Sequence, residues 1–180
     1  IDPLRPGAIA LSPANYSGLR VTLLGQLDGA RCPVQIDIGY GDAVTPAPEL
    51  ADYPVMLAGL PAPRIRVYPR YTVVAEKLHA ICLLGMANTR MKDYFDLLNL
   101  VREGRMDAMV LAQAVAATFQ RRGTPIPEAM PTGLAESFAR DATKQRQWRA
   151  FLDRSRLQAP GLDVVVRVVG DAVAQILNAG

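Results

Sequence analysis

The stretch from Ala75 to Leu100 constrains the fold of this chain more than any other. It reads AEKLHAICLLGMANTRMKDYFDLLNL, which is two helical patterns joined by a short break that contains Gly85 and Asn88. The first pattern is apolar almost all the way round its axis, and such a helix is normally buried. Charged side chains are almost never fully buried without a partner, so this helix pair needs ion pairs, a bound anion or a route to solvent.

Lys77 is the charged residue whose burial most needs an explanation, because it lies in the apolar first helix beside Glu76 and near His79. The sequence predicts that its ammonium group has a carboxylate partner, an anionic ligand or a path to solvent along its own stem. The lone His79 on an apolar helix is more typical of a hydrogen-bonded core residue than of a ligand or a base.

The second helix offers carboxylate partners for Lys77. Asp93 and Asp96 lie three positions apart, so they share one helix face, where two like charges repel by roughly 0.2–0.5 kcal/mol. Arg90 and Lys92 flank them. Such a cluster is either a structural salt-bridge network or a polar site, and an aspartate in a first helical turn is also favoured by the macrodipole. The residues alone leave these alternatives open.

Upstream of the helices, Leu19–Leu24 and Val34–Ile38 have the character of strands. The dipeptide Asp28-Gly29 between them predicts a hairpin, and hence an antiparallel pair. Asp37 lies on the polar face of the second strand, where it is either a solvated side chain or a functional carboxylate. The alternate residues of that strand are apolar and are expected to face a core: Val34, Ile36 and Ile38.

The rest of the chain completes an α+β pattern. We expect a small mixed or antiparallel sheet within residues 1–70 and a helical, bundle-like portion over residues 71–180 packed on it, in one compact domain. Proline-rich segments over Ile1–Asn15 and Thr45–Pro63 are predicted to be extended or irregular. The remaining predicted elements are a short strand at Arg64–Val67 and helices at Asp107–Gln120, Thr132–Arg140, Thr143–Ser155 and Gly161–Asn178.

Composition narrows the class of protein without defining it. The chain has 180 residues, half of them apolar, which is enough for one domain with a real core. Its net charge of +3 is compatible with an anionic partner. Two cysteines are too few for a disulfide framework, and no apolar run is long enough to span a membrane. We therefore expect a cytoplasmic protein with no membrane partner, and the basic final third, which contains Trp148, is either a solvated face or an RNA-backbone surface.

Two segments together carry a resemblance to a known family. VVAEKLHAICLLGMANTRMKDYFDLLNL and, upstream, VQIDIGYGD resemble the C-terminal signature of the AbiEii/AbiGii toxin family of nucleotidyltransferases. The shared features are an EKL helix, an intervening arginine and a K-D-x-x-D-L helix, and the likeness is strongest over Tyr16–Arg102. The resemblance implies a partial nucleotidyltransferase palm and transfer of a nucleoside monophosphate from an NTP to an acceptor such as RNA or tRNA. It also implies a toxin with a cognate antitoxin.

The resemblance also implies roles for individual residues. Asp37 matches the third carboxylate of a two-metal site, and so would hold Mg²⁺. Lys77 and Asp93 match functional positions and complete the candidate catalytic set with Asp37. Asp93 would either orient Lys77 or assist the acceptor hydroxyl, and the sequence does not separate these roles. The candidate nucleotide-binding residues are Lys77, Arg90, Lys92 and Asp96.

The chain departs from the family at its first motif, a Gly-Gly or Gly-Ser turn followed by an Asp-x-Asp strand, which this sequence does not contain. We expect either that the chain begins after that motif or that it is a degenerate member. On both accounts the isolated chain is expected to be inactive. The alternative function is a non-catalytic module of the same fold that binds a nucleotide, RNA or a protein, and a third interpretation is a salt-bridge cluster without a ligand.

Overall fold

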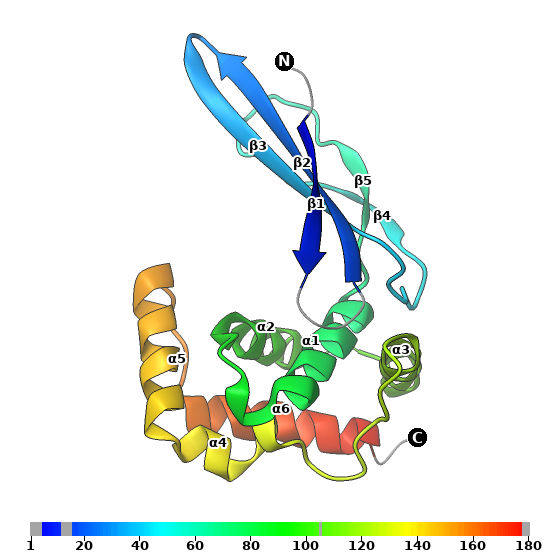
Figure 1. The fold of residues 1–180 in the computed structure, drawn as a ribbon, viewed down its shortest axis with the longest axis vertical. Helices are drawn as coiled ribbons and strands as arrows, with labels where there is room; N and C mark the ends of the chain where they lie inside the picture. The colour runs from blue at the N-terminus through cyan, green and yellow to red at the C-terminus, as the bar shows by residue number, and fades with distance from the viewer. Residues whose placement is uncertain (1–4, 12–15, 105, 178–180) are drawn as a thin grey trace. The chain divides into compact units, whose positions relative to one another are not determined.

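The computed structural model describes residues 5–11, 16–104 and 106–177, and Figure 1 shows its elements. The chain divides into two compact units, residues 1–42 and residues 43–180. The described residues form two small antiparallel sheets and six α-helices, which confirms the predicted α+β class. A boundary at residue 70, with the helices packed on the sheet, stays a prediction.

The first unit is an antiparallel sheet with the strand order β1-β2-β3. The turn between its last two strands is Asp28-Gly29, whose φ values of 48° and 79° fit the type I′ hairpin that this dipeptide favours. The predicted strand pair is therefore confirmed, with Leu19 opposite Ile38, and each strand runs beyond its predicted ends. The strands are β1 (Arg5–Leu11), β2 (Tyr16–Leu27) and β3 (Ala30–Gly39).

The apolar face of β3 corrects one expectation. Val34, Ile36 and Ile38 do share a face, but their side chains are 47%, 44% and 37% exposed instead of facing a core. A three-stranded sheet is a single layer, and it buries a face only where a second layer covers it. Strand alternation identifies residues that share a face, but it does not identify the covering layer.

The second unit begins with a two-stranded sheet and continues as helices. Strand β4 lies in a proline-rich segment that was expected to be irregular, and it spans only four residues. The predicted helix Thr132–Arg140 is divided, because Ala135 is extended (φ −80°, ψ 157°) between a 3₁₀ turn and α4. The elements are β4 (Glu49–Asp52), β5 (Arg64–Val67), α1 (Arg70–Leu84), α2 (Met91–Arg102), α3 (Ala108–Arg121), α4 (Glu136–Arg140), α5 (Ala142–Ser155) and α6 (Leu162–Leu177).

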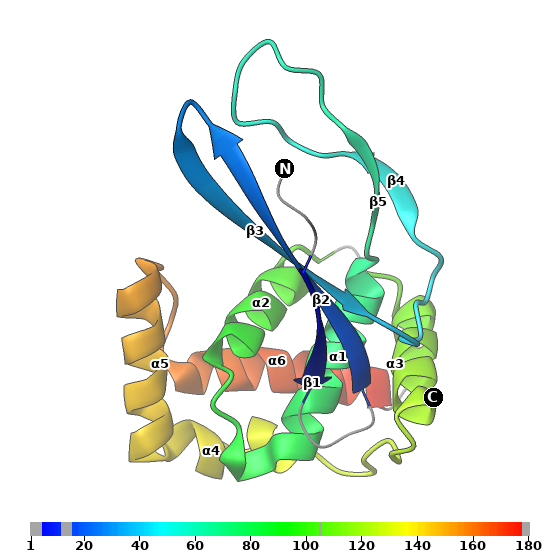
Figure 2. The ribbon, with the colours of Figure 1, turned by 45° about the horizontal axis from the view of Figure 1, so that its top comes forward.

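Helix α1 lies at the centre of the helical unit. It packs between α2 and α3, while α6 packs against α2, α3, α4 and α5 (Figure 2). Ala75, Leu78 and Ile81 on α1 are at most 1% exposed, as predicted for a helix that is apolar all round. Two aspartates cap helices: Asp107 caps α3, and Asp141 caps α5. No helix in the described part of the chain has the length and apolarity needed to cross a bilayer.

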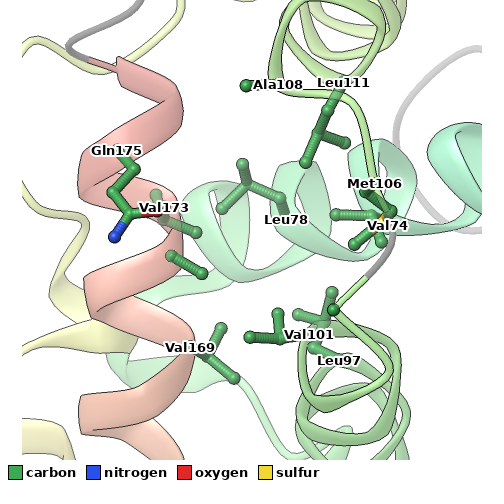
Figure 3. Close-up of a pocket in the computed structure, with 12 residues that line it drawn as sticks. Val74, Leu78, Leu97, Val101, Met106, Ala108, Leu111, Val169, Val173 and Gln175 are labelled. Carbon is green, nitrogen blue, oxygen red and sulfur yellow. The ribbon is translucent and has the colours of Figure 1, made fainter.

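A cavity of about 240 Å³ remains between α1, α2, α3 and α6 (Figure 3). Apolar side chains such as Leu78, Leu97 and Val169 point into it. Atoms that line empty space lose dispersion contacts, so added apolar atoms that fill the cavity should stabilise the fold.

Val101 at the end of α2 lines this cavity, and we expect Val101→Leu to stabilise the protein. One added methylene should raise the free energy of unfolding by about 0.5–1 kcal/mol, which corresponds to about 1–4 °C in melting temperature. Thermal unfolding measures the effect. Val168→Leu is the matched control, because it makes the same change on α6 outside the cavity lining. An equal gain in both variants would mean that helix propensity, and not cavity filling, is responsible.

Candidate functional site

The site is built on the facing sides of α1 and α2, in the second unit. Lys77 Nζ lies 2.8 Å from Asp93 Oδ1 and 2.7 Å from Asp96 Oδ2. Residues three apart on a helix lie on one face, so α2 presents both carboxylates to α1. Of the three alternatives predicted for Lys77, the structure shows the carboxylate partner, and Lys77 has two.

Two further cations extend this group into a row. Arg90 Nε lies 2.7 Å from Asp93 Oδ2, and Lys92 Nζ lies 2.6 Å from Asp96 Oδ2. The side chains therefore alternate in sign in the order Arg90, Asp93, Lys77, Asp96, Lys92, and we refer to these five residues as the charge row. Three cations against two carboxylates leave one net positive charge. All the candidate residues of the helical unit are thus brought together.

The inner members of the charge row are buried or partly buried and the two end members are exposed. The side chain of Asp93 is 4% exposed and that of Lys77 is 16% exposed, whereas Arg90 and Lys92 are 61% and 72% exposed. Ion pairs that involve such exposed side chains contribute only about 0–1 kcal/mol each. The outer cations can therefore exchange a carboxylate for another anion at little cost, while the inner pair stays fixed.

The charge row holds Lys77 and Asp96 in their ionised forms. Burial by itself lowers the pKa of Lys77, but hydrogen bonds to Asp93 and Asp96 outweigh burial, and the pKa lies above its ordinary value. For Asp96, burial raises the pKa, yet hydrogen bonds from Lys77 and Lys92 outweigh it and the pKa lies below its ordinary value. Lys77 is therefore a fixed cation at neutral pH and does not act as a base.

Asp93 uses its two oxygens differently. Oδ1 accepts a hydrogen bond of 2.8 Å from Lys77. Oδ2 is close to Arg90 Nε, but it accepts no hydrogen bond from any residue within the described ranges. A buried carboxylate oxygen normally has such a donor, so Oδ2 retains acceptor capacity.

His79 belongs to a separate polar group on α1. Its Nδ1 lies 3.0 Å from Arg122 Nη1 and its Nε2 lies 2.9 Å from Thr124 Oγ1. A guanidinium group only donates, so Nδ1 accepts and Nε2 carries the hydrogen. Burial, assisted by the charge of Arg122, lowers the pKa of His79 to about 4. The prediction of a hydrogen-bonded core histidine is confirmed, while its arginine partner was not predicted.

Asp37 lies on β3 in the first unit and is paired there. Arg20 stands directly opposite it on β2 and binds both carboxylate oxygens, with Nε–Oδ1 2.7 Å and Nη2–Oδ2 2.8 Å. These hydrogen bonds hold the pKa of Asp37 below its ordinary value. Sequence reasoning missed Arg20, although a hairpin at Asp28-Gly29 already sets residues 20 and 37 opposite each other. That Asp37, Lys77 and Asp93 share one site stays a prediction.

The described residues do not fit a divalent-metal site by themselves. No three His, Cys, Asp or Glu side chains within residues 5–11, 16–104 and 106–177 are grouped so that they could hold an ion. Both oxygens of Asp37 are already engaged by Arg20.

The basic C-terminal third of the chain does not expose Trp148, which was one feature of the RNA surface considered from the sequence. Trp148 is 1% exposed and donates its indole hydrogen bond to the carbonyl oxygen of Pro160, so it offers no ring for base stacking. Lys144 is also buried. The exposed cations of the α5 region are Arg146, Arg149, Arg154 and Arg156.

The α+β fold and the paired lysine and aspartates are compatible with one class of protein, the nucleotidyl transferase toxins. A family model described as "Nucleotidyl transferase AbiEii toxin, Type IV TA system" matches residues 2–177. Because this match covers almost the whole chain, the protein belongs to the AbiEii nucleotidyl transferase toxin family. Comparison with curated proteins gives no match. The resemblance inferred from the two signature segments is thereby confirmed.

Proposed function

We propose that the charge row is the NTP-binding part of a nucleotidyl transferase site. The observation that carries the proposal is the placement of Lys77. It is a fixed, largely buried cation held between two carboxylates, and cations at both ends of the row are open to solvent. Phosphoryl and nucleotidyl transfer rely on positioned charge around the phosphates, and this arrangement provides it.

The outer cations are proposed to receive the triphosphate. Arg90 offers a planar fork that suits two phosphate oxygens, and Lys92 offers a compact point charge. Each would exchange an exposed ion pair for phosphate, and Asp96 would remain with Lys77. The net positive charge of the row supports an anionic ligand over a cationic one.

The two roles considered for Asp93 use different oxygens. Oδ1 holds Lys77, which supports the orienting role. Oδ2 has acceptor capacity and lies under the exposed Arg90, so a shift of that side chain would let it accept a hydrogen bond from an acceptor hydroxyl. In the proposed reaction that hydroxyl gives its proton to Asp93 Oδ2, its oxygen bonds to the α-phosphorus, and the bond from this phosphorus to the pyrophosphate oxygen breaks.

The wider proposal follows from family membership. The acceptor is proposed to be RNA, with tRNA as the first candidate, and a cognate antitoxin is the proposed protein partner. Both NTPs and RNA are cytoplasmic, so the protein is proposed to act there. Asp37 and Mg²⁺ belong to the proposal only as the family implies them.

Nucleotide binding tests the proposal directly. With Mg²⁺ present, at least one NTP should raise the melting temperature in proportion to the logarithm of its concentration. Lys77→Met should lower the affinity for that NTP by about tenfold, the equivalent of about 1.4 kcal/mol of binding free energy. Arg140→Gln is the matched control, because it removes a cation from an exposed pair with Glu136 on α4. No shift with any NTP would contradict the proposal and favour a purely structural cluster.

A label-transfer assay separates the enzyme from the alternative, a non-catalytic module. RNA is incubated with NTP labelled at either the α- or the γ-phosphate. Nucleotidyl transfer attaches only the α-label to RNA. Binding without transfer is the expected result for these 180 residues, because they lack the Asp-x-Asp motif. If that result persists when the motif is supplied upstream, the protein is a binding module.

A further inference from the structure

We propose that Lys144 is a positioning residue for the charge row. Its buried ammonium group holds the connection between α1 and α2 from which Arg90 reaches Asp93. The consequence for nucleotide binding rests on the proposed function, whereas the contacts themselves do not.

The surroundings of Lys144 are unusual for a lysine. The residue is 6% exposed, and its Nζ donates a hydrogen bond of 2.8 Å to the backbone carbonyl oxygen of Asn88. Nζ also lies 3.5 Å from Gln147 Oε1 and 5.3 Å from the ring centroid of Phe138. No carboxylate among the described residues forms an ion pair with it, although buried lysines are almost always paired. A carbonyl oxygen and a ring face therefore hold the charge.

The contact of Lys144 with Asn88 leads directly to the site. Asn88 is fully buried, and its Oδ1 accepts a hydrogen bond of 2.9 Å from the backbone N–H of Arg90. Arg90 in turn lies 2.7 Å from Asp93 Oδ2. One residue of the connection thus links the ammonium group on α5 to the cation at the outer end of the charge row.

A second set of contacts connects Lys144 to the first turn of α2, through the rings of Phe138 and Tyr94. The ring of Phe138, over which Lys144 Nζ lies, stacks on Tyr94 with centroids 5.2 Å apart and an interplanar angle of 18°. Tyr94 follows Asp93 in α2, and its hydroxyl donates to the carbonyl oxygen of Gly133. Lys144 therefore supports both the residues before Asp93 and the residue after it.

The stability of a methionine variant separates positioning from a merely structural role. A buried charge with neutral partners is costly, and replacing buried charges by apolar groups of similar shape is often neutral or stabilising. Methionine matches lysine in length and packs well against rings, but it has no donor for Asn88. Positioning predicts that Lys144→Met keeps its stability and loosens Arg90, whereas a structural role predicts that stability and the site decline together.

The experiment measures amide hydrogen exchange and NTP affinity of the full chain with Lys144→Met. We expect the melting temperature to stay within about 4 °C of the wild type. Exchange at the Arg90 amide should accelerate by about tenfold, as for loss of one hydrogen bond, while the Leu78 amide on α1 stays unchanged. The affinity for the NTP that shifts the wild type should fall by about threefold or more.

Phe151→Leu is the matched control, because it weakens the packing of the same helix against Phe95 without touching Asn88. It should lower the melting temperature without a selective change at Arg90. Unchanged exchange at Arg90 in Lys144→Met, or parallel changes in both variants, would overturn the inference. So would accelerated exchange with full NTP affinity. If the wild type binds no NTP, the proposed function fails, and exchange at Arg90 still decides whether Lys144 holds the connection.

Discussion

Asp93→Ala is expected to lower the free energy of unfolding by about 3 kcal/mol, because removing one partner of a buried ion pair leaves the other charge uncompensated. Asp93 is 4% exposed and contacts both Lys77 and Arg90. Arg90 can turn to solvent, but Lys77 cannot do so fully, and it would depend on Asp96 alone. Denaturant unfolding at neutral pH measures the loss.

Two further variants test whether the stability lost in Asp93→Ala comes from breaking a buried ion pair. Asp96→Ala removes the more exposed carboxylate of the row, at 22%, and is expected to cost about 1 kcal/mol. The double variant Lys77→Met/Asp93→Leu replaces the pair by apolar side chains and should recover most of the stability lost in Asp93→Ala. If Asp93→Ala cost no more than Asp96→Ala, the inner pair would be as solvated as a surface pair, and the burial argument would fail.

Acidification from pH 7 to pH 4 is expected to lower stability by up to about 3 kcal/mol through His79 alone, at about 1.36 kcal/mol per pKa unit. The folded protein holds the pKa of His79 at about 4, whereas an unfolded histidine titrates near its ordinary value of 6.5. The unfolded chain therefore binds the proton first. The contribution is complete above about pH 6.5, is lost as the pH falls toward 4 and does not change below that.

The pH range from 4 to 7 reports on a single imidazole, because His79 is the only histidine in the chain. Unfolding of the wild type and of His79→Gln should be compared at several pH values between 4 and 7. The wild type should lose more stability on acidification than the variant. The carboxylate of Asp96 has a pKa below its ordinary value, so its contribution is lost at lower pH and does not mimic the effect. Parallel pH profiles would show that the imidazole is not held neutral by burial.

The inner part of the site was predictable because it depends on local helical spacing. The positions of Asp93 and Asp96 fix a shared face, and a carboxylate partner was one of the three alternatives that the apolar pattern around Lys77 left open. The pairing of Arg20 with Asp37 was equally accessible, since a two-residue hairpin fixes the register of its strands. These features follow from contacts within one or two neighbouring elements.

The rest depends on contacts that no local pattern specifies. Arg122 lies 43 positions from His79, and Lys144 lies 56 positions from Asn88, so both pairings follow from how the helices pack. The exposed face of β3 shows the same limit, because alternation contains no information about a covering layer. The short strand β4 escaped prediction because four residues between prolines give little periodicity.

The hydrogen bonds around the α1–α2 connection have a practical consequence for anyone who subclones this domain. A polypeptide cut after Arg102 would retain both segments that resemble the family, yet it would lose the acceptor at Gly133 for Tyr94 and the donor at Lys144 for Asn88. The signature segments therefore depend on residues beyond Arg102 for their folding, and an expression boundary drawn from the signature alone should give a misfolded product.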